Sequence, residues 1–296
     1  MNDSTFDYII VGAGTAGCLL ANRLSADASK RVLLIEAGKR DDYHWIHIPV
    51  GYLYCIGNPR TDWLYETEAA AGLNGRTLRY PRGKVLGGCS SINGMIYMRG
   101  QSRDYNQWAA ITDDPQWRWD QCLPYFKFHE DHHQGATETH GANGVPAALL
   151  NPQAHQDAAS AEYFRVLKAR KAGGEWRIEK QRLSWGVLDA FAQAAQQAGV
   201  PASADFNQGN NEGVGYFEVN QKSGWRWNTA QAFLRPTCYG RPNFELWTQA
   251  QVARLVIETD ADGGKRCTGV KVWDGHQLVT ATATREVALS AGSIGS

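Results

Sequence analysis

The stretch Asp7-Tyr-Ile-Ile-Val-Gly-Ala-Gly-Thr-Ala-Gly17 decides the fold of this chain. Its apolar part has the length of a buried strand, and glycines follow it at once. Ala16, Leu20 and Leu24 then recur at a spacing of four, which predicts a helix that packs these side chains against a sheet. A second apolar run at residues 31–36 completes a strand–helix–strand unit of about 30 residues. The sequence therefore predicts a parallel sheet.

The glycines form a Gly-x-Gly-x-x-Gly pattern between a strand and a helix, as a dinucleotide fingerprint requires. Gly12 permits the tight turn, Gly14 lets a pyrophosphate approach the backbone, and Gly17 lets helix and strand pack closely. The phosphates would lie on the helix N-terminus, whose N–H groups and dipole favour anions. Glu36, at the end of the second strand, is the acid expected to bind the adenosine ribose. This acid argues against NADP but leaves FAD and NAD open.

A second glycine-rich segment follows at residues 81–94. Gly87 and Gly88, followed by Cys89-Ser-Ser91, offer unhindered N–H groups and hydroxyls to a pyrophosphate or a flavin ring. Taken alone, the segment could equally be a structural loop.

Composition restricts the function classes. The 296 residues are 43% apolar, and thirty basic residues balance thirty acidic ones, so no net field would attract nucleic acid or an anionic membrane. No apolar run approaches the roughly 20 residues of a membrane span, and the N-terminus lacks the pattern of a signal peptide. Six scattered cysteines without a Cys-x-x-Cys pair fit neither a zinc site nor a disulfide framework. We expect a cytoplasmic protein with reduced thiols.

Later segments predict further elements. Trp185, Leu188 and Phe191 mark one face of an amphipathic helix over residues 184–199. Three apolar runs resemble strands of a β-meander, at residues 244–248, 252–257 and 270–273. Residues 287–292 predict a buried strand that enters a glycine turn. Because a parallel strand needs cover on both faces, we expect the fold to be truncated at the end of this chain.

Together these segments resemble the signatures of the glucose-methanol-choline (GMC) oxidoreductases, in order and spacing, and most of all the bacterial choline- or alcohol-dehydrogenase-like members. The segments that carry the resemblance are Gly12 to Leu24, Glu36-Ala-Gly38, residues 82–100, Asp104-Tyr105 with Trp108, Asp205-Phe-Asn207, Gly213-Val-Gly215 and residues 286–295.

The resemblance implies FAD as the cofactor. Some members attach the flavin to a histidine just after the Ser-Ser pair, but Ile92 stands there in this chain, so non-covalent FAD is expected. With Gly17 of the fingerprint, the residues expected to bind it are Gly12, Gly14, Thr15, Ala16, Glu36 and Ala37 at the adenosine end, Val85, Gly88, Asn93, Gly94, Met95 and Ile96 along the pyrophosphate and isoalloxazine, and Val252 near the adenine.

The resemblance also implies oxidation of a primary alcohol to an aldehyde, with hydride transfer to flavin N5. A histidine late in the family's sequence removes the hydroxyl proton, as a base with a pKa near 7 can. This chain has no such segment, and none of its eight histidines is assigned as catalytic. We therefore expect no turnover unless a second chain supplies the remainder.

His129-Glu-Asp-His-His133 clusters groups that can bind zinc. Without a clear helical face or further ligands, we expect a solvated polar loop and no metal.

The sequence thus predicts an α/β fold: a doubly wound, Rossmann-like FAD-binding domain with part of an α+β substrate domain. Residues 1–150 and 246–296 are assigned to the FAD-binding domain, and 151–245 to the substrate domain. Two alternatives remain open: an NAD-dependent dehydrogenase, and a non-catalytic or truncated FAD-binding fragment. Within the family, a lyase or a light-driven decarboxylase also remains open, because fold does not fix reaction.

Overall fold

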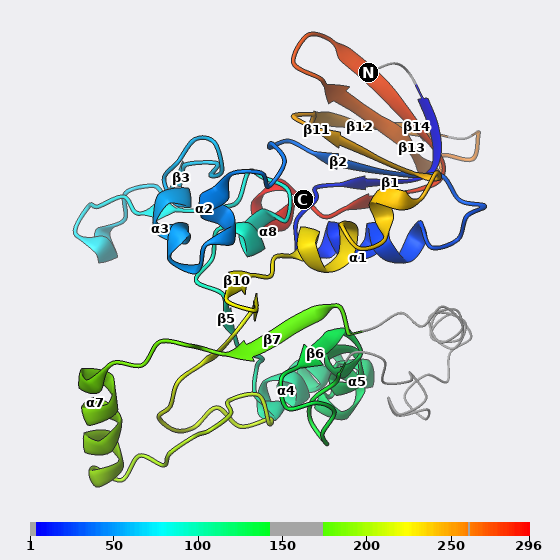
Figure 1. The fold of residues 1–296 in the computed structure, drawn as a ribbon. Coiled ribbons are helices and arrows are strands. Elements are labelled where there is room, and N and C mark those ends of the chain that lie inside the picture. Colours follow the sequence, from blue (N-terminus) through cyan, green and yellow to red (C-terminus); the bar gives the residue numbers. More distant parts are fainter. Residues whose placement is uncertain (1–3, 143–173, 260) are drawn as a thin grey trace. The chain divides into compact units, whose positions relative to one another are not determined.

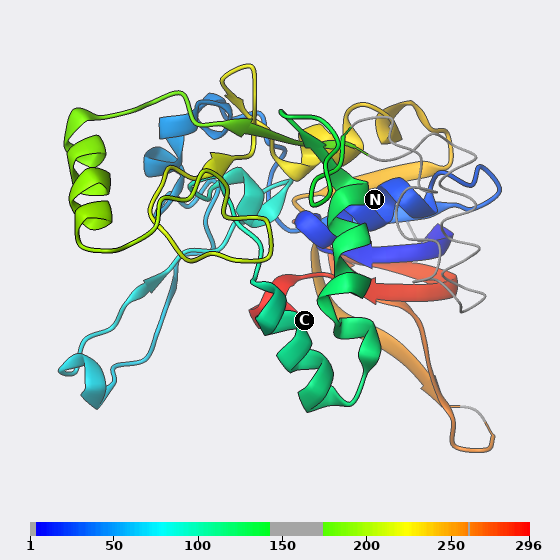
Figure 2. The same cartoon turned by 90° about the horizontal axis from the view of Figure 1, so that it is seen from below.

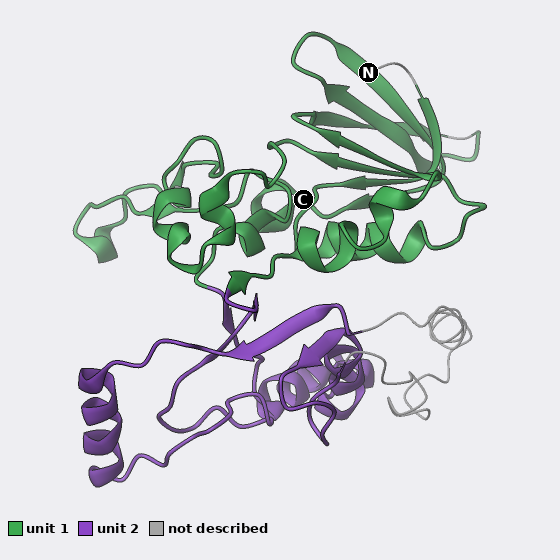
Figure 3. Cartoon of the chain, in the orientation of Figure 1, with its two compact units in different colours: residues 1–94, 225–296 green, residues 95–224 purple. Residues whose placement is uncertain are grey.

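The computed structural model describes residues 4–142, 174–259 and 261–296, drawn from two sides in Figures 1 and 2. The chain forms two compact units (Figure 3): unit 1, residues 1–94 and 225–296, and unit 2, residues 95–224. These units are defined by compactness, whereas the domains expected from the sequence are defined by function. The first part of the expected substrate domain, residues 151–173, lies outside the described residues.

Unit 1 is built on a six-stranded sheet with the order β11-β2-β1-β14-β13-β12. Its strands are β1 (Ser4–Val11), β2 (Val32–Glu36), β11 (Phe244–Thr248), β12 (Gln251–Thr259), β13 (Lys265–Trp273) and β14 (Leu278–Leu289). The first four strands in that order are parallel, and β13 and β12 are antiparallel. In the register of the central strand, Ile10 lies between Leu34 and Ala288. The predicted α/β class and parallel sheet are confirmed.

The prediction that residues 244–248 belong to the β-meander is wrong. They form β11, which pairs in parallel with β2, and the meander consists of β12, β13 and β14. The two-residue connection from β11 to β12 is held at the end of β2, because Gln249 N–H donates to the Gly38 carbonyl (2.8 Å) and Ala250 N–H to the Glu36 carbonyl (3.0 Å). These long-range bonds redirect the chain, and a local apolar pattern does not show them.

One hydrophobic core joins the parallel strands to the antiparallel ones. Phe6 meets Trp247 edge to face, with ring centroids 6.2 Å apart. The buried members of this core are Phe6, Ile9, Val11, Leu33, Ile35, Trp247, Ala250, Val270, Val272, Val279, Ala281 and Ala283. Since side chains alternate along a strand, the parallel strands place their opposite faces toward other parts of unit 1.

Helix α1 (Thr15–Leu24) follows β1 and lies against the sheet (Figure 1). Its buried face differs from the predicted one: Ala16 is exposed and Leu20 and Leu24 are half-buried, whereas the buried residues are Gly17, Cys18, Ala21, Asn22 and Arg23. The buried face differs because α1 also contacts the segment that contains Phe233 and Thr237. The Asn22 amide donates to the Phe233 carbonyl at 2.6 Å and to Thr237 Oγ1 at 2.7 Å, so a polar side chain occupies the buried face.

Short elements complete unit 1. They are α2 (His44–His47), η1 (Pro49–Gly51), α3 (Tyr52–Cys55), β3 (Tyr65–Glu66), η2 (Ala71–Leu73), β4 (Arg79–Tyr80), η3 (Gly88–Ser91), β10 (Trp225–Arg226), the π-helix η6 (Ala230–Leu234), η7 (Cys238–Gly240) and α8 (Gly292–Gly295). The buried Arg226 guanidinium links β10 to α2 and η3 by donating to the carbonyls of Ile46, of Ser90 and of Asn93, which follows η3.

Unit 2 contains a four-stranded sheet with the order β5-β8-β7-β6. Its elements are β5 (Ile96–Tyr97), α4 (Ser102–Thr112), η4 (Pro115–Trp117), α5 (Trp119–His129), β6 (Glu130–His132), β7 (Trp176–Lys180), α7 (Gly186–Gln197), β8 (Glu218–Val219) and β9 (Gln221–Lys222). Across residues 4–142, 174–259 and 261–296, none of the helices is long and apolar enough to cross a membrane.

The helix predicted over residues 184–199 is present as α7, but its apolar face is exposed within the described part of the chain. Val187 is 69% exposed and Phe191 is 67% exposed. Figure 2 shows α7 standing away from the strands of unit 2.

The prediction of a solvated loop at residues 129–133 is wrong, because Glu130 and His132 are buried. Glu130 pairs with Arg99 and accepts the Tyr97 hydroxyl. His140 contacts Glu130 at 3.1 Å and Asp205 at 2.8 Å. Burial opposes charge on His140, but the hydrogen bonds to Asp205 and Glu130 outweigh burial and raise its pKa to about 9. Unit 2 therefore has a charged, hydrogen-bonded interior.

Candidate dinucleotide-binding site

Unit 1 contains a cavity of about 880 Å³ at the carboxyl ends of β1 and β2. In open parallel sheets, ligands bind at this edge. The lining residues are Val11, Gly12, Gly14, Thr15, Ala16, Ile35, Glu36, Ala37, Trp63, Tyr65, Arg82, Gly83, Gly88, Cys89, residues 250–255 and residues 289–296. The cavity thus brings together six segments that are separated in the sequence.

The turn from β1 into α1 requires glycine for two different reasons. Gly12 has a φ of +96°, and a Cβ there would lie 2.6 Å from the Ser290 carbonyl oxygen. Gly17 has an ordinary φ, but its Cβ would lie 1.9 Å from the Gly12 carbonyl oxygen. The expected structural roles of these glycines, tight turn and close packing, are therefore confirmed.

Gly14 differs from both. A Cβ at this position would find its nearest neighbour, Gly88 Cα, 3.9 Å away, so the fold itself leaves room for a side chain. Gly14 is also the N-cap of α1 and offers no side-chain acceptor to the first turn. The N–H groups of Thr15 and Ala16 have no intrahelical acceptor, and both residues line the cavity. An anion in the cavity would meet these N–H groups and the positive end of the helix dipole.

Glu36 is a buried acid on the wall of the cavity. Its Oε2 accepts the Ala13 N–H and its Oε1 accepts the Gly38 N–H, both at 2.9 Å. Burial raises the pKa of Glu36 to about 7, although the two backbone hydrogen bonds and the charge of Lys84 act in the opposite direction. A carboxylate oxygen accepts more than one hydrogen bond, so Glu36 can also accept hydroxyl donors from a ligand.

The second glycine-rich segment packs directly on the first. Gly87 N–H donates to the Ala13 carbonyl at 2.8 Å. A Cβ on Gly88, whose φ is +55°, would lie 2.7 Å from Gly14 Cα. Gly88 and Cys89 therefore line the cavity beside the N-terminus of α1.

The structure brings together eight of the predicted cofactor residues as cavity lining: Gly12, Gly14, Thr15, Ala16, Glu36, Ala37, Gly88 and Val252. The others lie elsewhere. Gly17 and Val85 are buried and are not among the residues that line this cavity. Asn93 accepts Arg226 at its carbonyl and at Oδ1, next to Gly94. Met95 and Ile96 belong to unit 2, where Met95 has a φ of +63° and its carbonyl accepts the Asn220 N–H.

Sequence patterns missed part of the lining. Trp63 and Tyr65 stack with centroids 5.7 Å apart and planes 3° apart, and Lys84 Nζ lies 4.4 Å from the Trp63 ring centroid. Trp63 stands in a stretch without sustained periodicity, so the sequence leaves open whether it lines a pocket or belongs to the core. Apart from Val252, residues 250–255 were not predicted as cavity lining, because only the folded sheet brings them there.

A central parallel strand that enters a glycine turn at a helix N-terminus, beside a buried acid on the next strand, defines a dinucleotide-binding α/β protein. Comparison with known proteins narrows this class. Residues 6–296 match the family described as GMC oxidoreductase. The chain belongs to this family, and the resemblance seen in its sequence is confirmed.

Individual relatives agree with this assignment. The chain is 37% identical to "Alcohol dehydrogenase [acceptor]" of Pseudomonas putida over 98% of its own length and 46% of the relative's. It is 35% identical to "Choline dehydrogenase, mitochondrial" of Homo sapiens, over 98% of its own length and 44% of that relative's. The crystal structure of pyridoxine 4-oxidase from Mesorbium loti superimposes with a TM-score of 0.81 at 32% identity, over 97% of this chain and 50% of that one. The chain thus spans about half the length of the curated relatives it matches.

Proposed function

We propose that this chain is the FAD-binding part of an oxidoreductase that acts on the CH–OH group of a primary alcohol. One observation carries the proposal: a single cavity is lined by the N-terminus of α1, the glycines of two separate segments and the buried acid Glu36. The family supports FAD as the ligand, and relatives named alcohol and choline dehydrogenases support an alcohol as the substrate.

The residues of the cavity fit FAD. Gly14 leaves open space where a side chain would stand, which suits a pyrophosphate close to the backbone. Glu36 retains capacity to accept ribose hydroxyls. Of the expected contacts, Thr15, Ala16 and Ala37 belong to the adenosine end and Val252 to the adenine. Ile92 is buried and has no nucleophilic atom, which supports non-covalent binding.

When bound, FAD would supply a hydride acceptor, its N5 atom, for the oxidation of the alcohol. The residues of this chain bind and orient the cofactor. Val85, Asn93, Gly94, Met95 and Ile96 are proposed to lie along the flavin, and unit 2 is proposed to contribute to the alcohol pocket. The base that removes the hydroxyl proton is proposed to be a histidine outside these 296 residues, on a second chain or a further segment. The aldehyde is the product, and the cytoplasm is the proposed location.

Spectroscopy of natively purified material tests the cofactor. We expect flavin absorbance near roughly 375 and 450 nm, release of FAD on denaturation, and rebinding of FAD but not of NAD. Glu36→Gln should weaken FAD binding at least about tenfold, or ~1.4 kcal/mol. Glu258→Gln, an exposed acid on β12, is the matched control and should bind as the parent does. A folded chain that binds NAD in preference to FAD would contradict the cofactor assignment.

Activity tests the reaction. With an artificial electron acceptor and a panel of primary alcohols, we expect aldehyde formation only when the segment that carries the histidine is present. Turnover of primary alcohols by the FAD-loaded 296-residue chain alone would show that the base lies within it and would overturn that part of the proposal.

A further inference from the structure

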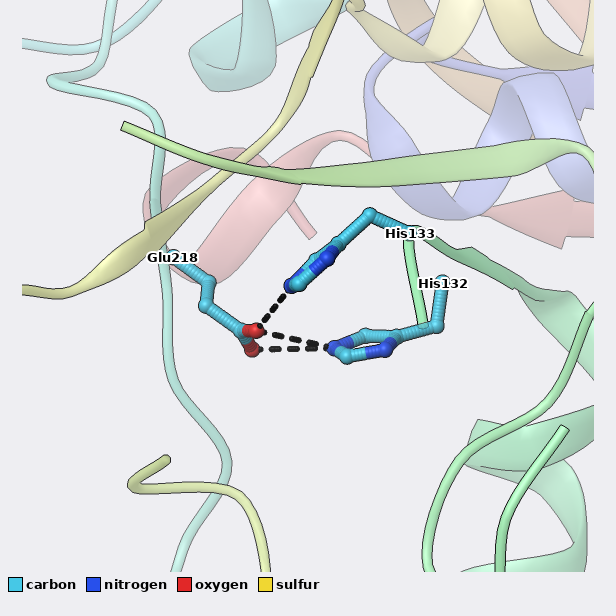
Figure 4. A group of neighbouring side chains, drawn as sticks. All are labelled: His132, His133 and Glu218. Carbon is cyan, nitrogen blue, oxygen red and sulfur yellow. Dashed lines mark hydrogen bonds and ion pairs between the residues drawn. The ribbon is translucent and has the colours of Figure 1, made fainter. Parts of the chain in front are cut away.

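Three side chains of unit 2 converge on one point beside its sheet (Figure 4): His132, His133 and Glu218. His132 Nε2 lies 3.0 and 3.1 Å from the two carboxylate oxygens of Glu218, and His133 Nε2 lies 2.8 Å from Oε1. His132 ends β6 and Glu218 begins β8, with β7 between these strands. We call these residues the His–His–Glu cluster.

Glu218 differs from the other buried carboxylates of unit 2 in its partners. Glu130 pairs with Arg99, and Asp205 pairs with His140. Within the described part of the chain, the partners recorded for Glu218 are the two imidazoles and the Asn207 amide at 3.5 Å. None of these has a permanent charge. A buried carboxylate without a cation is costly, so this position favours a bound positive charge.

Packing fixes the orientation of His132. Its ring stacks on the His140 ring with centroids 3.7 Å apart and planes 14° apart. His140 is in turn held between the carboxylates of Glu130 and Asp205. The stacked pair therefore keeps His132 Nε2 directed at Glu218.

We propose that the His–His–Glu cluster binds a divalent transition metal ion of the zinc class, through the Nε2 atoms of both histidines and the carboxylate of Glu218. Two imidazoles and a carboxylate suit zinc. Ligand atoms around a tetrahedral ion with bonds of about 2.1 Å lie roughly 3.4 Å apart. The observed separations of 2.8–3.1 Å therefore need to widen by only a few tenths of an ångström.

Access to the site comes from the side of His133. The His133 side chain is 17% exposed, whereas that of His132 is fully buried. A water molecule on the His133 side would complete four-coordination. His140 is excluded as a ligand of the same ion, because both of its nitrogens contact carboxylates and its ring is parallel to that of His132.

A hydrogen on His132 Nε2 occupies the position that the metal ion would take. Gln134 N–H lies 3.4 Å from His132 Nδ1, which favours the tautomer that keeps a hydrogen on Nε2 and donates it to Glu218. When the ion binds, that hydrogen leaves Nε2, the ring is protonated on Nδ1 instead, and the long Gln134 contact is lost. The metal-bound and hydrogen-bonded states are therefore exclusive.

The ion would cross-link β6 to β8 across β7. β8 also pairs with β5 through Ile96–Val219 and Tyr97–Glu218. Metal binding would therefore stabilise the sheet of unit 2, and it does not involve the residues that line the cavity of unit 1.

The test uses the full chain without an affinity tag, dialysed against about 10 µM Zn²⁺ and analysed by elemental mass spectrometry. We expect one zinc per chain, and an X-ray absorption spectrum with two imidazole ligands. His133→Gln, at the rim, should weaken zinc binding at least about tenfold and abolish the rise in melting temperature that zinc gives the parent. His276→Gln, an exposed histidine in unit 1, is the control and should bind zinc as the parent does.

Glu218→Gln provides a second variant, and far-UV circular dichroism establishes that each variant is folded. If the parent binds no zinc under these conditions, the proposal is overturned. It is also overturned if folded His133→Gln retains one tightly bound zinc, because the ion then lies at another site.

Discussion

At the scale of the residue, a substitution at Gly14 should affect ligand binding, whereas the same substitution at Gly17 should affect folding. A Cβ on Gly17 would lie 1.9 Å from a backbone oxygen, so Gly17→Ala should destabilise the chain by about 1–3 kcal/mol. A Cβ on Gly14 has 3.9 Å of clearance but enters the cavity. Gly14→Ala should therefore keep its unfolding midpoint in urea and bind FAD at least about tenfold more weakly, or ~1.4 kcal/mol. Equal loss of stability in both variants would contradict this separation.

Glu36 makes the stability of the cofactor-free chain depend on pH. Burial raises its pKa from an ordinary 4.5 to about 7 on folding. The folded chain thus holds this proton more tightly than the unfolded chain does, and the resulting stability is present below pH 4.5 and lost as the pH rises to about 7. The loss should approach about 3 kcal/mol.

Urea unfolding at pH 5 and pH 7.5 measures this effect. The free energy of unfolding of Glu36→Gln should fall less between these values than that of the parent, because the amide does not titrate. Glu258→Gln should follow the parent. Parallel pH profiles for the parent and Glu36→Gln would show that Glu36 titrates alike in both states.

At the scale of the element, sequence patterns predicted the helices and strands whose formation depends on neighbouring residues. The unit of β1, α1 and β2 follows from two apolar runs and a glycine turn, all within about 30 residues. The pairing of β11 with β2 does not, because it depends on backbone bonds from Gln249 and Ala250 to the end of β2. The buried face of α1 was likewise set by a partner more than 200 residues away, the segment that contains Phe233 and Thr237.

That contact can be tested directly. Asn22→Ala leaves the Phe233 carbonyl without the donor now at 2.6 Å and removes the bond to Thr237. The Phe233 carbonyl still accepts the Thr237 hydroxyl at 3.2 Å. We expect a loss of about 1–3 kcal/mol in the free energy of unfolding, the net contribution of the two hydrogen bonds that are removed. Gln197→Ala, an exposed amide at the end of α7, should change stability by less than about 0.5 kcal/mol. If both variants unfold alike, Asn22 does not anchor α1.

At the scale of the whole molecule, the cavity could be predicted only in part. Its glycines and Glu36 carry a sequence signal because their spacing is imposed by one strand–helix–strand unit. Trp63, Arg82 and residues 250–255 reach the same cavity from other segments, and the sheet order that brings them there is a property of the complete fold. The buried charges around Glu130 were missed for the same reason, since their partners Arg99 and His140 lie 31 and 10 residues away.

Hydrogen exchange of the whole chain, with and without FAD, can establish which segments the cofactor contacts. Because a ligand that binds the folded state suppresses opening, protection should appear in segments 11–17, 35–37, 82–89 and 250–255, which contribute residues to the cavity lining of unit 1. Residues 93–96 should also be protected if they lie along the flavin as proposed. Strands β6 and β7 should exchange at unchanged rates. Protection of the cavity segments without residues 93–96 would limit the binding site to unit 1. Uniform protection of both units would mean that FAD stabilises the whole chain, and would contradict local contacts in unit 1 as the source of the protection.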